Sequence, residues 1–271
     1  MISNQNYLLK IAKDIRKIIF DKVSKRGGHI STSFSAVEIL VSLYFDNYFR
    51  FNKKLAKSSK RDFFILSKGH AAILMFAILF KKGIISKKNF DTNYKDGNYS
   101  LGGHVSHKTL GVEASTGAVG HGLGLASGIA FANKIKKVKN FTYALLGDAE
   151  CSEGSVWEAA LFANKHKLNN LIAIIDNNKI GATEFTQNYI EFNNLANMFQ
   201  SFGWIVKKCD GHNFKSIKKN IISLKKNKAL KPKILIAETI KGKGLKFLEN
   251  DPSWHSRKMS KIQIDLGLKK L

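Results

Sequence analysis

Cysteine, proline and long apolar runs are scarce in this 271-residue sequence, and each shortage excludes a class of protein. Its two cysteines, Cys151 and Cys209, can form no disulfide framework and lack the spacing of metal ligands, which fits a reducing cytosol. No run reaches the roughly 18 apolar residues of a membrane span, and residues 1–20 lack the apolar core and cleavage site of a secretory signal. We therefore expect a cytoplasmic protein with no membrane association.

Acidic residues are also few, because 20 Asp and Glu stand against 45 Lys and Arg, which gives a formal net charge of +25. Such a balance can mark nucleic-acid binding. The lysines are scattered along predicted helices and loops, as in IKKVKN and SIKKNIISLKKNK, and are not gathered into one basic arm. We therefore do not expect nucleic acid as the main partner, and we expect the positive field to attract anionic sugar phosphates.

Helical and strand patterns alternate along the chain, and no repeat or Pro- or Ser-rich linker divides it, so we expect a single domain over residues 1–271. The predicted helices cover residues 7–25, 36–48, 70–82, 118–137, 193–201 and 214–226. Strands are predicted at 63–67, 203–209 and 233–238, with a strand–helix–strand unit within 141–181. This alternation predicts an α/β fold with a parallel sheet flanked by helices on both faces. Residues 95–116, rich in Gly, Ser and His, are predicted to form a functional loop.

The unit within residues 141–181 carries polar residues where its two strands end. Gly147-Asp148 closes the first apolar run, and Asn177-Asn178 closes the second. In an open parallel sheet, ligands bind at the carboxyl ends of the strands. Carboxylate and amide oxygens suit Mg²⁺, which proteins usually hold through few side chains together with substrate phosphates. The unit therefore indicates a site for a metal-bridged diphosphate, whereas the alternative for Asp148 is a helix-capping carboxylate.

Glycines and histidines mark further segments. The run GAVGHGLGLASG begins at Gly117, and its glycines can expose backbone N–H groups to phosphate or permit close helix packing. No strand leads directly into this run, so it does not match the dinucleotide-binding fingerprint. Four histidines, which can contact phosphate or sugar hydroxyls and move protons near neutral pH, have similar local settings: His29, His70 and His104 follow glycine, and His255 follows tryptophan. His107, His166 and His212 are expected to be surface residues.

The pair of strand ends resembles the thiamine diphosphate signature of transketolases, a GDG turn followed about thirty residues later by an asparagine. Further segments are similar to family segments in the same order: RGGHISTSFSAVEIL, RDFFILSKGHAAILMFAIL, LGGHV, GVEASTGAVGHGLGLASGIA, and TIKGKG followed by WH. The likeness is closest to the N-terminal subunit of split transketolases, in which the diphosphate-binding and pyrimidine-binding halves are separate polypeptides. The resemblance implies the thiamine diphosphate-binding fold of the diphosphate (PP) type.

The resemblance also implies a set of site residues. Asp148 and Asn178 would be side-chain ligands of Mg²⁺, and the carbonyl of Ile180 a third ligand. The four histidines would act in catalysis, with His70 and His255 at the cofactor diphosphate or reacting centre and His29 and His104 facing the donor ketose and the thiazolium. The remaining cofactor-binding positions would be Gly117, Gly147, Ala149, Glu153 and Glu158. The two glutamates match family carboxylates that link two active sites across a subunit contact, and the alternative for both is an exposed glutamate in the first turn of a helix.

The implied activity is transfer of a two-carbon ketol unit from a ketose phosphate to an aldose acceptor, with thiamine diphosphate and Mg²⁺. In the family, a glutamate on the pyrimidine side activates the cofactor, and the residues after Leu235 leave no room for that domain. We therefore expect an α₂β₂ assembly with a separate pyrimidine-binding subunit. Two alternatives stay open: another thiamine diphosphate enzyme, such as a 2-oxo acid dehydrogenase or deoxyxylulose phosphate synthase, and a non-catalytic basic binding protein.

The chain departs from the family pattern at several positions. Ala149 stands where the family usually has glycine, and a left-handed conformation there would cost about 1 kcal/mol. His121 stands where glutamine is usual, Ala118 where proline is frequent, and Thr32 and Ser33 where glycines are frequent. None of these changes removes a predicted metal ligand. The particular donor and acceptor sugars are left open.

Overall fold

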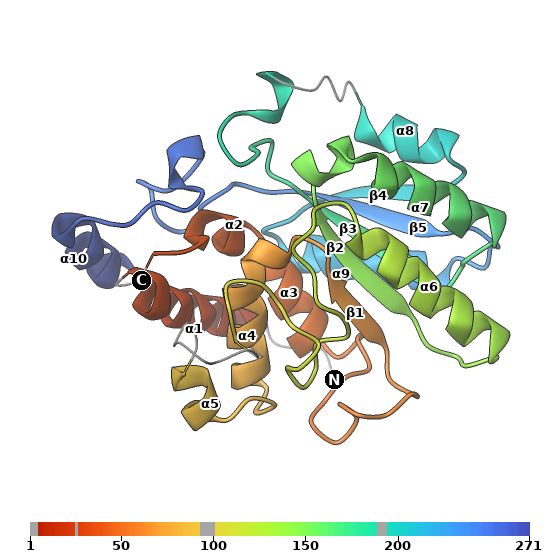
Figure 1. Ribbon diagram of the computed structural model, residues 1–271, viewed down its shortest axis with the longest axis horizontal. Coiled ribbons are helices and arrows are strands. Elements are labelled where there is room, and N and C mark those ends of the chain that lie inside the picture. Colours follow the sequence, from red (N-terminus) through yellow and green to blue (C-terminus); the bar gives the residue numbers. More distant parts are fainter. Residues whose placement is uncertain (1–4, 25–26, 93–100, 189–193) are drawn as a thin grey trace.

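Five parallel strands form the centre of the molecule (Figure 1). The computed structural model describes residues 5–24, 27–92, 101–188 and 194–271. The strand order is β1-β2-β3-β5-β4, with bounds β1 Phe63–Leu66, β2 Thr142–Gly147, β3 Leu171–Asn177, β4 Ile205–Asp210 and β5 Lys233–Glu238. Each neighbouring pair is parallel, as the alternation of helices and strands predicted.

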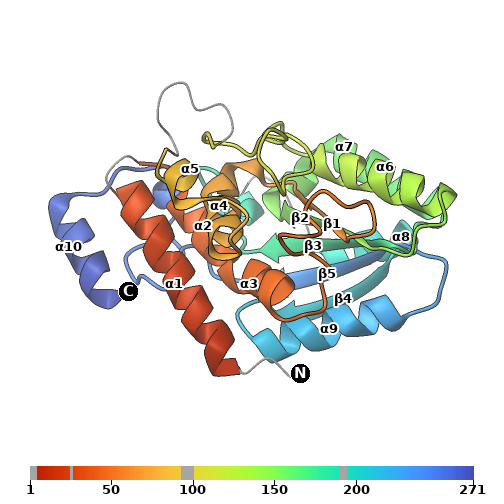
Figure 2. The same cartoon turned by 90° about the horizontal axis from the view of Figure 1, so that it is seen from below.

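Helices cover both faces of this sheet (Figure 2). On one face lie α6 (Gly122–Ile135), α7 (Gly154–Lys165) and α8 (Leu195–Ser201). The other face is covered by α9 (Phe214–Lys226) and α3 (Val37–Phe45), with α1 (Gln5–Ser24), α2 (Ile30–Ser35) and α4 (Ala72–Lys81) packed beyond. Because side chains alternate along a strand, Tyr143 and Leu145 join one apolar layer while Ala144 and Leu146 join the other. The predicted α/β architecture is confirmed.

Several predicted boundaries shift for local reasons. The helix predicted over 118–137 begins at Gly122, because Gly117 and Gly120 have φ of +152° and +87° and form a turn ahead of it. The helix predicted over 36–48 is shorter and follows a break at Ala36. The loop predicted over 95–116 has no helix or strand within residues 101–116, and residues 95–100 lie outside the described residues, as do 25 and 193 at the ends of two predicted helices.

Three helices were not predicted: α2, α5 (Lys87–Asp91) and α10 (Lys261–Lys270). A capping box starts α10, since Ser260 accepts the N–H of Gln263 and Gln263 accepts that of Ser260. Helix α10 lies beside α1 (Figures 1 and 2). The approach depends on Gly267, because a Cβ there would come within 2.1 Å of the Phe20 ring. None of the described helices is long and apolar enough to cross a membrane.

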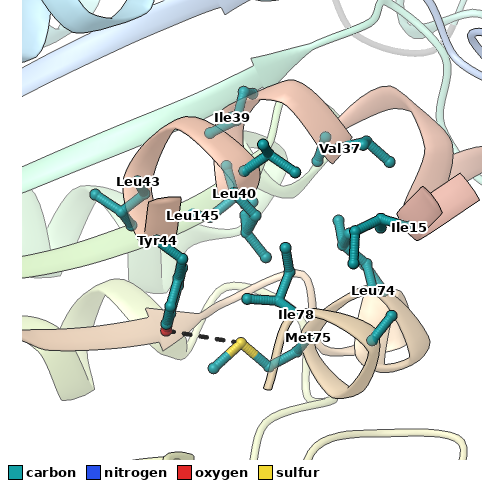
Figure 3. Close-up of a cluster of buried hydrophobic side chains, with 14 of the residues drawn as sticks. Ile15, Val37, Ile39, Leu40, Leu43, Tyr44, Leu74, Met75, Ile78 and Leu145 are labelled. Atoms are coloured by element: carbon teal, nitrogen blue, oxygen red, sulfur yellow. Dashed lines mark hydrogen bonds between the residues drawn. The ribbon is translucent and has the colours of Figure 1, made fainter. Parts of the chain in front are cut away.

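The largest apolar cluster lies between the sheet and helices α1, α3 and α4 (Figure 3). All nine residues of α3 are buried, which explains why its sequence has no polar face. Ile15 of α1, Leu40 of α3, Ile78 of α4 and Leu145 of β2 point into this cluster. Its one polar contact among the drawn residues joins the Tyr44 hydroxyl to the Met75 sulfur at 3.8 Å.

This core yields a stability prediction. Ile78→Ala should lower the free energy of unfolding by about 2–5 kcal/mol, because a fully buried side chain leaves a cavity when it is truncated. The matched control is Ile262→Ala on α10, where the side chain is 80% exposed and the expected change is within about 0.5 kcal/mol. Denaturant titration of the two purified variants measures both values, and equal losses would contradict this description of the core.

Candidate active site

A cavity of about 430 Å³ opens at the carboxyl edge of the sheet. Strand β1 leads into it through the segment Lys68–His70, β2 through Gly147–Ala149, and β3 through Asn178 and Ile180. Lys241 and His255, from the chain beyond β5, complete the part of its wall discussed below. Parallel strands end at the same edge of a sheet, so residues that are far apart in the sequence meet here.

Asp148 follows β2 directly and is buried. One carboxylate oxygen accepts the N–H of Ala149 at 2.8 Å, and the other accepts the N–H of Lys179 from the turn after β3. Burial, and then the negative charge of Asp176, raise the pKa of Asp148 to about 7. Each oxygen keeps a second lone pair, and a cation in the cavity would favour the ionised form.

Of the two asparagines at the end of β3, Asn177 in the strand and Asn178 directly after it, Asn178 is the one that lines this cavity. It is buried, and its side-chain oxygen accepts the N–H of Ile180 at 3.2 Å. Asn177 instead donates to Glu238 at 2.9 Å. Lys179 between Asn178 and Ile180 has a φ of +62°, and this turn directs its N–H to Asp148.

The donors at this edge fit a magnesium ion that is shared with a diphosphate. They comprise one carboxylate, one amide oxygen and the carbonyl of Ile180, all hard oxygen ligands. Within the described parts of the chain, no three His, Cys, Asp or Glu side chains gather into a metal-binding group. An ion held by so few protein groups needs further oxygen ligands, and Mg²⁺ commonly takes these from phosphates and water.

Ala149 causes no backbone strain at the predicted glycine position. It opens a short 3₁₀ helix, and it is not among the described non-glycine residues with positive φ. The left-handed conformation that would have made alanine costly is therefore not adopted, and the N–H of Ala149 remains a donor, here to Asp148.

The four predicted histidines lie together at this edge of the sheet. Ring centroids are 5.0 Å apart for His29 and His255, 5.4 Å for His29 and His70, 5.3 Å for His70 and His255, and 6.2 Å for His29 and His104. His70 shares a hydrogen bond of 3.0 Å with the hydroxyl of Thr32. Four segments far apart in the sequence supply these rings, so the cluster is a property of the fold.

The more buried histidines are uncharged at neutral pH. Burial, followed by the charge of Lys68, lowers the pKa of His70 to about 2. Burial and the charge of Lys241 lower the pKa of His255 to about 3, and burial and His104 lower the pKa of His29. A neutral imidazole has one donor and one acceptor nitrogen, which suits exchange of protons with hydroxyl groups.

Two buried lysines in the cavity wall were not predicted. Lys68 forms an ion pair with Asp176, a fully buried carboxylate, and donates to the carbonyl of Thr32 at 3.2 Å. Lys241 donates to the carbonyls of Ile180 and Gly181, and burial followed by the charge of Lys68 lowers its pKa to about 8. Both lysines lie beside glycine, in SKGH and TIKGKG, which is the signal that could have separated them from the scattered surface lysines.

Glu150 is a further buried carboxylate in the cavity wall. It accepts the Ser67 hydroxyl, the N–H of Gly120 at 3.0 Å and the N–H of Gly147 at 3.1 Å. Two of the glycine N–H groups are therefore bonded to Glu150. Gly117 lines the cavity, and its role in binding a cofactor stays a prediction. A Cβ at this position would come within 2.9 Å of the His104 ring.

Of the four histidines, His70 and His255 line this cavity, whereas His29 and His104 do not, and the remaining predicted residues also lie outside it. Glu153 and Glu158 are exposed at the start and on the outer face of α7, and their roles at a subunit contact stay predictions. His107 is exposed, as expected. The surface expectation is wrong for His212, whose side chain is only 15% exposed and bonds Glu38 at 2.9 Å, while His166 is half-buried against two phenylalanine rings.

A parallel sheet with oxygen donors gathered at its carboxyl edge is typical of α/β enzymes that bind a phosphate-bearing ligand there. Residues 8–270 match the family described as "Transketolase, thiamine diphosphate binding domain", and the chain belongs to this family. The expected family and fold are thus confirmed.

Relatives fall into two size classes. The chain is 40% identical to one named subunit of the apulose-4-phosphate transketolase of Actinobacillus succinogenes, over 97% of this chain and 95% of that protein. It is 34% identical to the 6-deoxy-6-sulfo-D-fructose transketolase subunit SqwG of Clostridium sp., over 92% of this chain and 90% of that protein. The crystal structure of transketolase from Campylobacter jejuni superposes with a TM-score of 0.90 at 28% identity, over 98% of this chain and 43% of that one. The chain thus spans less than half of this solved transketolase.

The glycine-rich start of α6 yields a prediction with an internal control. Gly122→Ala should destabilise the chain and displace Ser67 from Glu150, because a Cβ would come within 2.2 Å of the Ser67 hydroxyl. At Gly124 an added Cβ meets no heavy atom of the described residues within 4 Å, so Gly124→Ala should stabilise the helix by up to about 1 kcal/mol. Thermal melts of the isolated chain compare the two, and equal shifts would refute the close packing at Gly122.

Proposed function

We propose that this chain is the diphosphate-binding subunit of a two-subunit transketolase. The enzyme transfers a two-carbon ketol unit from a ketose phosphate or a similar anionic ketose to an aldose acceptor. The observation that carries the proposal is the meeting of Asp148 and Asn178, from neighbouring strands, in one cavity with neutral histidines and buried lysines. The family match favours this activity over the pyruvate-dependent and non-catalytic alternatives.

In this proposal Asp148, Asn178 and the carbonyl of Ile180 hold Mg²⁺, and the ion binds the diphosphate of the cofactor. Lys241 and His255, which lie 3.3 Å apart in the wall of the same cavity, supply donors to the phosphates. Gly117, Gly147 and Ala149 line this cavity without bulky side chains. When bound, thiamine diphosphate supplies a nucleophilic carbon and an electron sink, which no side chain can replace.

In this proposal the histidines bind the sugar substrates. His70, held by Thr32, and His29 present neutral rings that donate to and accept from the hydroxyl and carbonyl groups of the ketose. His104 is exposed at the mouth of the site, where an acceptor aldose can reach it. The positive charge of Lys241, whose amine bonds neutral carbonyls, attracts an anionic substrate to this edge, whereas the charge of Lys68 is offset by Asp176.

A second polypeptide completes the active site. Two relatives that match this chain over most of their length are each named as one subunit of an apulose-4-phosphate transketolase, which supports a separate partner. The partner supplies the pyrimidine-binding half and the glutamate that activates the cofactor, in an α₂β₂ assembly. Leu125, Leu161 and Phe162 are exposed on α6 and α7, and Phe162 lines a hollow together with Glu158, which supports a subunit contact at these helices.

The substrates after which the relatives are named narrow the expected class of donor sugar. Apulose 4-phosphate and 6-deoxy-6-sulfofructose are ketoses that carry an anionic group. We propose a donor of this kind, with a terminal phosphate or sulfonate. The two free, buried cysteines support a place in the reducing cytoplasm.

The metal assignment is tested by the two neighbouring asparagines. Asn178→Ala should weaken Mg²⁺-dependent thiamine diphosphate binding by at least about tenfold, since even partners outside the ligand shell are worth that much. Asn177→Ala is the matched control and should bind like the wild type, because Asn177 bonds Glu238 instead. Isothermal calorimetry on the assembled enzyme measures both affinities, and chelation of the metal should abolish binding. An equal loss in both variants would overturn the assignment.

The two-subunit proposal is tested by affinity capture of the tagged chain from its native cells, followed by mass spectrometry. We expect a protein with a pyrimidine-binding domain to be captured in equal amount. Ketol transfer, assayed with anionic ketoses, thiamine diphosphate and Mg²⁺, should require both chains, and the captured complex should have the mass of an α₂β₂ assembly. Full activity of this chain alone would refute the proposal, as would capture of nucleic acid without such a protein.

A further inference from the structure

The turn that carries Lys241 is held by hydrogen bonds from its backbone to residues elsewhere in the fold. It follows β5 as residues 239–244, and the N–H of Gly242, where φ is +80°, donates to Ser31 at 2.9 Å. Two further hydrogen bonds hold the backbone before and after Lys241. The N–H of Ile240 donates to His212, and the carbonyl of Lys243 accepts from Arg16. Both distances are 2.8 Å. The backbone before and after Lys241 is therefore held by side chains from elsewhere in the fold.

His212 has a defined tautomer in this arrangement. Its Nε2 accepts the N–H of Ile240, so the ring proton must lie on Nδ1. Nδ1 lies 2.9 Å from Oε2 of Glu38, to which it donates. The imidazole thus transmits the position of a carboxylate on α3 to the backbone of the turn after β5.

Arg16 closes the network from the other end. Its Nη1 and Nη2 donate to the two carboxylate oxygens of Glu38 at 2.6 and 2.8 Å. Its Nε donates to the carbonyl of Lys243, and Nη2 also donates to the carbonyl of Phe34 at 3.1 Å. Arg16 and Glu38 are both buried, each about 7% exposed. Burial opposes ionisation of Glu38, but the hydrogen bonds from His212 and Arg16 outweigh it and lower the pKa of Glu38 to about 2.

These contacts form one circuit, from Ile240 through His212, Glu38 and Arg16 to Lys243. Lys241, the residue that the circuit encloses, reaches inward to the carbonyls of Ile180 and Gly181 and lies 3.3 Å from Nδ1 of His255. Arg16, Glu38 and His212 are not among the described residues that line the cavity. They cannot touch a ligand in the cavity themselves, so their effect on binding passes through the segments that they hold. His212 holds only the turn, whereas Arg16 also bonds α2 through the carbonyl of Phe34.

We propose that Arg16, Glu38 and His212 are positioning residues that aim Lys241 at the diphosphate site, with His212 as the element that sets the turn. The proposal rests on the proposed function, in which Lys241 is a donor to the phosphates. A long lysine side chain has many rotamers, so a fixed backbone at its base reduces the entropy lost when a ligand is bound.

The test compares His212→Gln with His212→Asn in the full chain. A glutamine oxygen can take the place of Nε2 and accept the N–H of Ile240, whereas an asparagine amide reaches only the Nδ1 position and bonds Glu38 alone. Lys241→Met serves as the reference for loss of the cation. The probe is inorganic diphosphate with Mg²⁺, and calorimetry gives the affinity. Hydrogen exchange by mass spectrometry reports the order of residues 239–244, with α6 as the internal reference.

We expect Lys241→Met to weaken diphosphate binding by about tenfold or more, because a hydrogen bond from a charged group is lost. His212→Asn should weaken diphosphate binding several-fold and speed hydrogen exchange in the turn but not in α6. His212→Gln should stay close to the wild type in both diphosphate affinity and the exchange rate of the turn. If His212→Asn does not fold, Arg16→Lys replaces it, since a lysine keeps the charge beside Glu38 but cannot also bond Lys243.

The outcomes distinguish the role of Lys241 in diphosphate binding from the positioning role of Arg16, Glu38 and His212. No binding by the wild type, or normal binding by Lys241→Met, overturns the proposed role of Lys241 and the positioning proposal with it. A loss in Lys241→Met alone leaves the diphosphate site standing and overturns the positioning role. Equal losses of affinity and of thermal stability in the asparagine and glutamine variants would show a merely structural role, and this also overturns it.

Discussion

The arrangement of the active site depends on one buried carboxylate, that of Asp176 at the end of β3. It pairs with Lys68 after β1, and it accepts the hydroxyls of Ser35 in α2 at 2.5 Å and of Thr239 after β5. Each bonded segment carries a residue of the site within a few positions: His70, Thr32, Lys241 and, beyond Asp176 itself, Asn178. Removing one partner of such a pair costs about 3–5 kcal/mol, because the other charge stays buried. The same contact therefore stabilises the fold and fixes the positions of the residues around the cavity.

The cavity wall carries groups of both signs. Asp148 and the neutral oxygens after β3 suit a divalent cation, while Lys241, and Lys68 paired with Asp176, add positive charge to the same wall. His70 and His255 are neutral because they are buried near these lysines. A metal-bridged diphosphate can use both kinds of group at once. The proposed chemistry and the unusual pKa values thus have a common origin, which is burial of unlike charges at one edge of a sheet.

The fold also brings a second region to the surface. Helices α6 and α7 pack their inner faces on the sheet, yet Leu125, Leu161 and Phe162 remain exposed, together with Glu153 and Glu158. In the proposed two-subunit enzyme this face would meet a partner, and the exposed carboxylates would then be buried, as the family resemblance implies.

Sequence alone was enough for the α/β class, and it singled out Asp148, Asn178 and the four histidines, which the structure places at one edge of the sheet, because these signals are local. Apolar periodicity, a polar residue at a strand end and a glycine beside a histidine are each readable within a few positions. Lys68, Lys241 and His212 were missed or misjudged, and α2, α5 and α10 were not foreseen. The partners that give these side chains their roles are distant: Lys68 and Asp176 lie 108 residues apart, and His212 and Glu38 lie 174 apart. Among 45 Lys and Arg residues, only the tertiary structure could decide which few are buried, since burial depends on which strand ends and helices meet.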